Sequence, residues 1–287
     1  MIVINSIRKT RLSIFRYVRY YEKKHILFAS LRYFFRFFGK KKHPLPGKLI
    51  VSLTSYPPRF STLHLTLKSL LSQSVTPDLT ILWLFKDDIK KLTPKVRALI
   101  GEKFEIRAVE RDTKSYKKLI PAIIEFPNAY IVTADDDTYY DSNWLRDLVA
   151  SHHVGQKEVL GHRGHYISVM PDGTIAPYST WHWDTQELKP DPKVFLTGVG
   201  GILYPPGALS AEVLNEGDYL KICPRSDDIW FYFMARCNGF VARKIIGNFN
   251  GYSWGETQDV ALFHSNVAGG ANDTAMQAMV LKFGSPL

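Results

Sequence analysis

The sequence predicts an α/β fold: an open, mostly parallel central sheet flanked by helices, preceded by a basic amphipathic helical arm. Two observations predict the sheet. Four short apolar segments alternate with helical segments in the first half of the chain, and three aspartates directly follow the fourth apolar segment. Strands that alternate with helices usually form parallel sheets through βαβ units. With 287 residues, 45% of them hydrophobic, the chain is long enough to bury a large core.

The first 43 residues hold the entire excess of positive charge. They contain twelve Lys and Arg and one acid, Glu22, whereas the remaining 25 bases and 26 acids nearly cancel. A nucleic-acid enzyme usually carries its basic surface on the body, so we expect no nucleic-acid partner. The two cysteines, Cys223 and Cys237, indicate neither a disulfide framework nor a Cys-based zinc site.

The basic arm interleaves its charges with large apolar residues at roughly helical spacing, including Phe34, Phe35 and Phe38. Its charge-poor runs are far shorter than the ~20 residues that span a bilayer. A basic, Phe-rich amphipathic helix suits an anionic membrane surface, so we expect residues 1–43 to bind the inner, cytoplasmic face of a membrane peripherally. The alternatives are a helix packed on the body with solvated bases, and RNA binding. Residues 40–47 are typical of a linker.

The body begins with a strand from Lys48 to Thr54, followed by a polar turn that contains Pro57 and Pro58. Apolar and β-branched runs bounded by turn residues predict the strands that follow. The further elements expected in the first half are a helix at 61–73, a strand at 79–85, a helix at 94–100, a strand at 104–109, a helix ending near 126 and a strand at 129–134.

Asp135, Asp136 and Asp137 lie where the fourth strand should end. In open α/β sheets, ligands bind outside the carboxyl ends of the strands. Three adjacent carboxylates repel one another and need a counter-charge near a buried strand end. A divalent cation with oxygen ligands would supply that charge. A solvated turn is the alternative, because Asp is common in turns.

The second half is predicted to hold a second acidic cluster. Asp227 and Asp228 open a strongly apolar helix, 229–237, for which Ser226 is a suitable N-cap. Capping alone could explain them. Because the helix is apolar and therefore buried, its N-terminus should face a cleft, where a carboxylate can act as a general base. The other expected elements are a helix from Asp141 or Ser142 to about 150, hairpin-like strands across 162–194, an apolar stretch at 197–204, a strand at 241–246 and a polar, Gly-rich tail.

His264, in that tail, could complete a metal site if the tail folds back on the three aspartates. Gly200 and Gly201 fit either a strand bulge or a close approach of a ligand to the backbone. Three tryptophans could belong to the core, but in polar, Gly-containing loops they are better placed to stack on a sugar or base. They are Trp181, Trp183 and Trp254.

Four segments in order make the chain similar to glycosyltransferases of the GT-A fold, specifically the bacterial nucleotide-sugar-dependent, inverting type. They are residues 51–59 (VSLTSYPPR), Asp112 with residues 115–119 (SYKKL), residues 133–137 (TADDD), and Gly200-Gly201 followed by residues 226–230 (SDDIW). The resemblance covers about residues 48–266. Each segment is loose by itself, and the match rests on their order and spacing.

The resemblance implies a role for each matching residue. Asp135 and Asp137 would hold Mn²⁺ or Mg²⁺ against the donor diphosphate, Asp137 more directly, with His264 as a further ligand. The implied donor-site residues are Thr54, Tyr56, Arg59 and Asp136 around the base and ribose, Asp112, and Lys118 near the phosphates. Asp228 would deprotonate the acceptor. Because many inverting relatives have Glu-Asp instead of Asp-Asp, the choice between Asp227 and Asp228 and the stereochemical outcome stay open.

The leading hypothesis is therefore a metal-dependent transferase that moves a sugar from a nucleotide-sugar to a glycan or glycolipid, as polysaccharide or lipopolysaccharide biosynthesis requires. A metal-dependent nucleotidyl- or phosphotransferase and a catalytically silent carbohydrate-binding protein are the alternatives. Residues 1–47 would form the arm and linker, and 48–287 a single GT-A-like catalytic domain. Within it, 48–140 would bind the nucleotide-sugar and 141–287 the acceptor.

Overall fold

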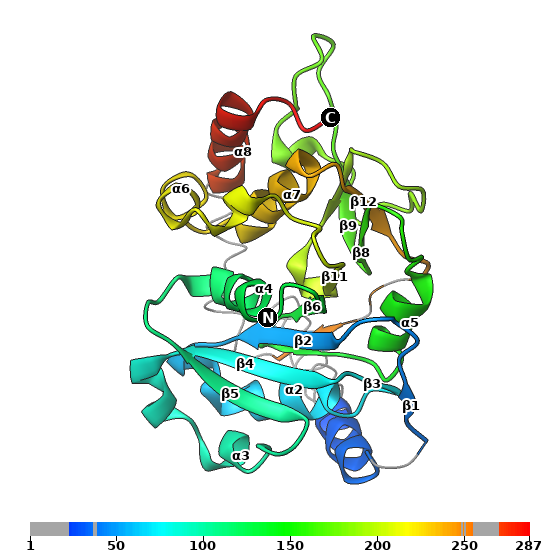
Figure 1. The fold of residues 1–287 in the computed structure, drawn as a ribbon, viewed down its shortest axis with the longest axis vertical. Coiled ribbons are helices and arrows are strands. Elements are labelled where there is room, and N and C mark those ends of the chain that lie inside the picture. Colours follow the sequence, from blue (N-terminus) through cyan, green and yellow to red (C-terminus); the bar gives the residue numbers. More distant parts are fainter. Residues whose placement is uncertain (1–22, 37–38, 248, 250, 255–269) are drawn as a thin grey trace, which may run out of the picture.

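A seven-stranded sheet runs through the molecule in the order β12-β8-β11-β6-β2-β4-β5 (Figure 1). The structure is a computed structural model, and it describes residues 23–36, 39–247, 249, 251–254 and 270–287. The strands are β2 (Leu49–Thr54), β4 (Leu79–Phe85), β5 (Phe104–Val109), β6 (Tyr130–Ala134), β8 (Glu158–Gly161), β11 (Ile202–Tyr204) and β12 (Val241–Lys244).

Four of the six pairings in this sheet are parallel, and β11 is antiparallel to both of its neighbours, β6 and β8. Since parallel strands need crossovers, helices follow β2, β4 and β5 along the chain before the next strand begins. The predicted fold class, an α/β protein with an open, mostly parallel sheet flanked by helices, is confirmed.

Alternate residues of the central strands point into two separate cores, as the pleat requires. Ile50 of β2 joins a core with α4 (Ile120–Glu125), α7 (Asp227–Cys237) and α8 (Ala271–Phe283), whereas its neighbours Leu49 and Val51 join a core with α2, α3 and α5. The helices of the second core are α2 (Phe60–Leu70), α3 (Pro94–Arg97) and α5 (Trp144–Ser151). A further helix, α6 (Glu216–Ile222), packs beside α8.

Short elements complete the fold and position its loops. Three small two-stranded sheets pair segments distant in sequence: β1 (Lys41–Lys42) with β3 (Val75–Thr76), β9 (Gly164–Tyr166) with β10 (Val194–Leu196), and β7 (Thr138–Tyr139) with β13 (Tyr252–Ser253). The 3-10 helices are η1 (Pro57–Arg59), η2 (Lys86–Lys91), η3 (Lys114–Lys118), η4 (Tyr178–Thr180), η5 (Gly198–Gly200) and η6 (Ala211–Leu214).

The expected elements agree best where apolar runs have clear turn boundaries. The strands predicted at 79–85 and 104–109 are β4 and β5 with unchanged bounds. The helix expected to end near 126 is instead divided into η3 and α4, because Pro121 lacks the N–H that would continue a helix. Part of the predicted linker forms β1, and part of the predicted polar tail forms α8.

Residues 23–34 form a helix at the edge of the molecule beside α2, which confirms helical structure in part of the predicted arm (Figure 1). Within the described ranges, every helix is too short or too polar to cross a bilayer. Residues 1–22 and His264 lie outside the described residues.

Candidate active site

A cavity of about 620 Å³ lies at the carboxyl ends of β2 and β6. Ten of the eleven site residues expected from the sequence line it, and the eleventh, His264, lies outside the described residues. The ten are Thr54, Tyr56, Arg59, Asp112, Lys118, Asp135, Asp136, Asp137, Asp227 and Asp228. The strand ends and the α7 N-terminus, far apart in sequence, therefore meet at one cavity.

The acidic loop after β6 is fixed mainly through Asp136. Its Oδ1 accepts a bond from Arg59 Nη1 at 2.6 Å, and its Oδ2 accepts one from Ser55 Oγ at 2.5 Å. The same guanidinium lies 3.0 Å from Asp137 Oδ2. Burial raises the pKa of Asp136, while Arg59 opposes that rise. Arg59 thus supplies part of the counter-charge that the sequence alone assigned to a metal.

The backbone of the acidic loop is bonded to distant segments. Thr66 Oγ1 of α2 donates to Asp136 O at 2.9 Å and accepts from Trp254 Nε1 at 2.8 Å. The Trp254 N–H donates to Asp137 O at 2.9 Å. Trp254 is fully buried in the core, so the expectation that it stacks on a sugar or base is wrong. These bonds hold the loop that carries the three carboxylates.

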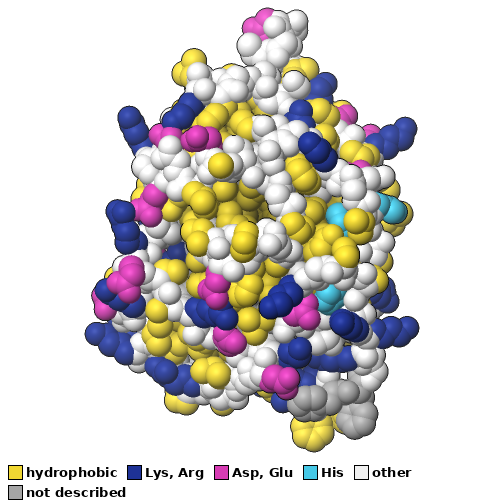
Figure 2. Space-filling view, viewed as in Figure 1, with side chains coloured by type: hydrophobic (Ala, Val, Ile, Leu, Met, Phe, Trp, Pro, Cys, Tyr) yellow, Lys and Arg dark blue, Asp and Glu magenta, His cyan; other side chains and the backbone are white. Residues whose placement is uncertain are grey.

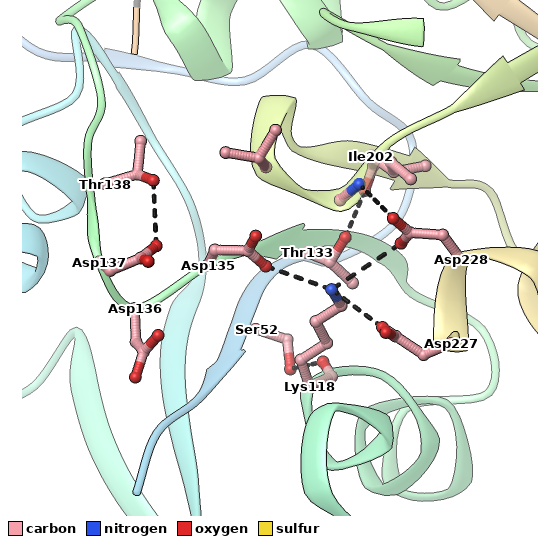
Figure 3. A network of polar contacts seen from close by, with 12 residues as sticks. Ser52, Lys118, Thr133, Asp135, Asp136, Asp137, Thr138, Ile202, Asp227 and Asp228 are labelled. Atoms are coloured by element: carbon pink, nitrogen blue, oxygen red, sulfur yellow. Dashed lines mark hydrogen bonds and ion pairs between the residues drawn. The ribbon is translucent and has the colours of Figure 1, made fainter. Parts of the chain in front are cut away.

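Lys118 joins the two acidic clusters (Figure 3). Its Nζ lies 3.2 Å from Asp135 Oδ1, 3.0 Å from Asp227 Oδ2 and 4.0 Å from Asp228 Oδ1. Its carbonyl accepts a bond from Ser52 Oγ of β2 at 2.6 Å, which fixes the lysine against the sheet. Although burial alone lowers a lysine pKa, the three carboxylates hold the pKa of Lys118 well above its usual value.

Asp228 lies at the cavity end of α7, with a partly exposed side chain. Burial raises its pKa to about 7, although Lys118 opposes the rise. Its Oδ2 accepts a bond from the Gly198 N–H at 3.0 Å. A Cβ at Gly198 would lie 2.6 Å from Lys118 Nζ and 2.9 Å from Asp228 Oδ1, so a larger residue there would displace the ends of both side chains.

Ser226 is the N-cap residue of α7, as expected, but its side chain does not make the capping hydrogen bond. Its hydroxyl donates to Asn272 Oδ1 of α8 at 2.7 Å instead of accepting from the helix backbone. Ser226 and Asn272 both line the cavity. The sequence reading missed Asn272 because it assigned residue 272 to a polar tail.

The first and third aspartates could bind a divalent cation with the help of a ligand. Asp135 and Asp137 offer hard oxygen donors, and Mg²⁺ is commonly held by one or two carboxylates together with substrate phosphates. Burial and the neighbouring carboxylates raise the pKa of Asp137 to about 6. Within the described ranges, His, Cys, Asp and Glu form no group of three arranged as a metal cage. Asp135 and Asp137 therefore fit a metal ion whose remaining ligands come from a bound phosphate group.

Residues of the β9–β10 region also line the cavity. Arg163 Nε lies 2.7 Å from Asp184 Oδ1, and its Nη1 donates to Thr197 Oγ1 at 3.1 Å. The ring of Trp183, which is partly exposed, lies 4.8 Å from that of buried His165. Arg163 and His165 carried no signal in the sequence beyond their place in a hairpin. Trp183 is exposed and lines the cavity, whereas Trp181 is buried in the core, so the expectation that Trp181 stacks on a ligand is wrong.

Gly200 and Gly201 are explained by packing. Gly201 has φ +82°, and a Cβ there would lie 2.4 Å from the Trp144 ring. Trp144 Nε1 donates to Gly200 O at 2.7 Å. Of the two predicted roles, a strand irregularity and a close approach by a ligand, the structure supports the first: the indole of α5 occupies the space that a side chain would need.

Comparison with known proteins identifies no family for this chain. Neither protein-family models nor curated proteins match the sequence. A solved structure with a similar fold is that of a protein from Bacillus anthracis described as a glucose-1-phosphate thymidylyltransferase, in complex with sucrose. It aligns with a TM-score of 0.40 and 13% identity over 80% of this chain and 95% of that chain. A similarity of this size does not bear on the reaction.

Proposed function

We propose that this chain is a glycosyltransferase that moves a sugar from a nucleoside-diphosphate-sugar to a hydroxyl of a glycan or glycolipid, with Mn²⁺ or Mg²⁺. The observation that carries the proposal is the meeting of two acidic clusters in one cavity, bridged by Lys118. Sugar transfer needs two acidic groups with different tasks, one toward the leaving diphosphate and one toward the acceptor hydroxyl.

The charge of the cavity supports the metal. Six carboxylates and five Lys or Arg residues line it, so the cavity carries about one negative charge when all of them are ionised. A diphosphate would be repelled by that field. A divalent cation bound at Asp135 and Asp137 would reverse the sign and would stabilise the negative charge of the leaving diphosphate. His264 remains a proposed further ligand.

On the donor side, we assign Tyr56, Arg59 and Asp136 to the base and ribose and Lys118 to the phosphates. Thr54 and Asp112 also line the cavity. Thr54 Oγ1 already donates to Trp83 O at 2.8 Å, which supports a positioning role for this residue. The nucleotide would thus occupy the ends of β2 and β6, where ligands of open α/β sheets usually bind.

On the acceptor side, Asp228 would take the proton of the attacking hydroxyl. A base is most effective when its pKa is near the working pH, and the pKa of Asp228 is raised to about 7. Asp227, buried and 3.0 Å from Lys118, would hold that lysine in place. The Trp183 ring would stack on the apolar face of an acceptor sugar. The products would be the glycoside and a nucleoside diphosphate.

The test is a panel of nucleotide-sugars assayed for release of nucleoside diphosphate with and without Mn²⁺. We expect Asp228→Asn to lower transfer by about 10²–10⁴-fold while calorimetry shows unchanged donor affinity. Asp137→Ala should abolish metal-dependent donor binding. Asp87→Asn, an exposed aspartate after β4 and outside the cavity, is the matched control and should change neither.

Three outcomes would overturn the assignment. Full metal-dependent turnover by Asp137→Ala would remove the metal role from the acidic loop. If the chain instead released pyrophosphate from a nucleoside triphosphate and a sugar 1-phosphate, and released no nucleoside diphosphate from any nucleotide-sugar, it would be a nucleotidyltransferase, the alternative that uses the same donor groups. Tight glycan binding without any donor binding would indicate a silent carbohydrate-binding protein.

A further inference from the structure

The helix over residues 23–34 and the two residues after it carry an exposed apolar stripe. Five large hydrophobic side chains are exposed within nine residues, out of fifteen in the whole described chain. Leu27, Leu31 and Phe34 are 57%, 45% and 73% exposed and follow the i, i+4, i+7 spacing of a single helix face. Phe28 and Phe35 extend the stripe along one side. Single exposed hydrophobic residues are ordinary, whereas a contiguous group marks an interaction surface.

The opposite face of the same helix is fixed to the body. Arg32 donates to Tyr139 Oη and to Ser72 O, each at 2.9 Å. The His25 ring stacks on Tyr252 with centroids 4.6 Å apart, and Ala29 is fully buried. The body of the chain therefore packs against the opposite face of this helix, and the exposed stripe points away from the body.

Charge distinguishes the possible occupants of the stripe. Residues 23–43 contain seven Lys and Arg and no acid, and Lys23, Lys24, Lys41 and Lys42 are exposed. Hydrophobic and basic side chains lie together at the lower edge of the molecule, where Figure 1 places this helix (Figure 2). Two copies meeting here would bring like charges together. Residues 1–22 carry five further bases and one acid, so they too would be repelled.

We propose that the stripe formed by Leu27, Phe28, Leu31, Phe34 and Phe35 is a docking surface for an anionic lipid membrane. The apolar side chains would enter the boundary between headgroups and acyl chains, and the flanking lysines would contact anionic headgroups. Tyr139, which anchors the helix through Arg32, is two residues from Asp137. The docking helix is therefore braced against the segment that carries the acidic loop.

Co-sedimentation of the full-length chain with sucrose-loaded vesicles tests this surface without any nucleotide or acceptor, so it is independent of the proposed sugar transfer. We expect binding to phosphatidylcholine vesicles that contain about one third phosphatidylglycerol, and weaker binding in ~0.5 M NaCl. The double variant Leu31→Gln/Phe34→Gln should lower the partition coefficient by about tenfold or more. Leu281→Gln changes an exposed leucine on α8 and is the matched control that should bind as the parent chain does.

Melting temperatures of both variants should equal that of the parent chain, because the substituted side chains are exposed. Unchanged vesicle binding by the double variant would overturn the proposal, even if deletion of residues 1–22 abolished binding. Equal binding of the parent chain to pure phosphatidylcholine would also overturn it. So would a parent dimer that the double variant dissociates while neither protein binds vesicles, because the stripe would then be an interface between copies.

Discussion

Replacing Lys118 by Met tests whether this lysine holds the two acidic clusters together. The substitution keeps most of the side-chain volume and removes the charge that lies within 4.0 Å of three carboxylates. Breaking a buried ion pair from one side costs about 3–5 kcal/mol, because the remaining charge stays buried without its partner. Asp227 is the most buried of the three partners, whereas Asp135 and Asp228 retain access to water. We therefore expect a loss of about 3 kcal/mol in the free energy of unfolding at about pH 8.

This loss should shrink as the pH falls. The pKa of Asp228 is already raised to about 7 with Lys118 present, and removal of the lysine raises it further. An acid whose folded pKa exceeds its unfolded pKa destabilises the fold most above the folded pKa. The penalty declines as the pH falls below the folded pKa and is lost at the unfolded pKa. At about pH 5.5 the variant should recover a large part of the lost stability.

Urea unfolding of the parent chain and of Lys118→Met at both pH values measures the effect. Lys117→Met is the matched control. Lys117 is buried like Lys118 and adjacent to it, but among the described residues its ion pair is with half-exposed Asp112, so its loss should be about 1 kcal/mol. A loss below about 1 kcal/mol for Lys118→Met at the higher pH, or a loss that does not depend on pH, would refute this account of the clusters.

Two further substitutions test the wall around the cavity. Burial lowers the pKa of His165 to about 4, so the free energy of unfolding should fall by up to about 3 kcal/mol as the pH falls from 6.5 to 4. His165→Gln should reduce this pH dependence in urea unfolding, and an unchanged pH dependence would contradict the role of His165. Gly201→Ala should lower stability by more than about 2 kcal/mol in thermal unfolding, because its Cβ would enter the Trp144 ring. Gly207→Ala, at a similar positive φ with open space around it, should lower stability by about 1 kcal/mol, and equal losses would contradict the packing argument.

The sequence was sufficient for the sheet and for most of the lining of the cavity, because both depend on local patterns. Apolar runs with sharp ends located β4 and β5, and charged residues after strand ends located Asp135 and Lys118. The site residues that the sequence missed depend on distant contacts. Asn272 reaches the cavity through its bond to Ser226, and no local pattern reports that pairing. The counter-charge on the acidic loop was assigned to a metal alone because the fold that brings Arg59 to Asp136 is not visible in the sequence.

The bonds between Trp254, Thr66 and the acidic loop have a consequence for the order of folding. Thr66 and Trp254 are 188 residues apart in the chain, so their bond is among the most nonlocal in the protein. Contacts of such long sequence separation form late, and a growing chain folds its N-terminal part first. We expect a nascent chain to assemble the strands from β2 to β6 while the loop after β6 still lacks its support. The carboxylates would then acquire their final arrangement only when nearly the whole protein has been synthesised.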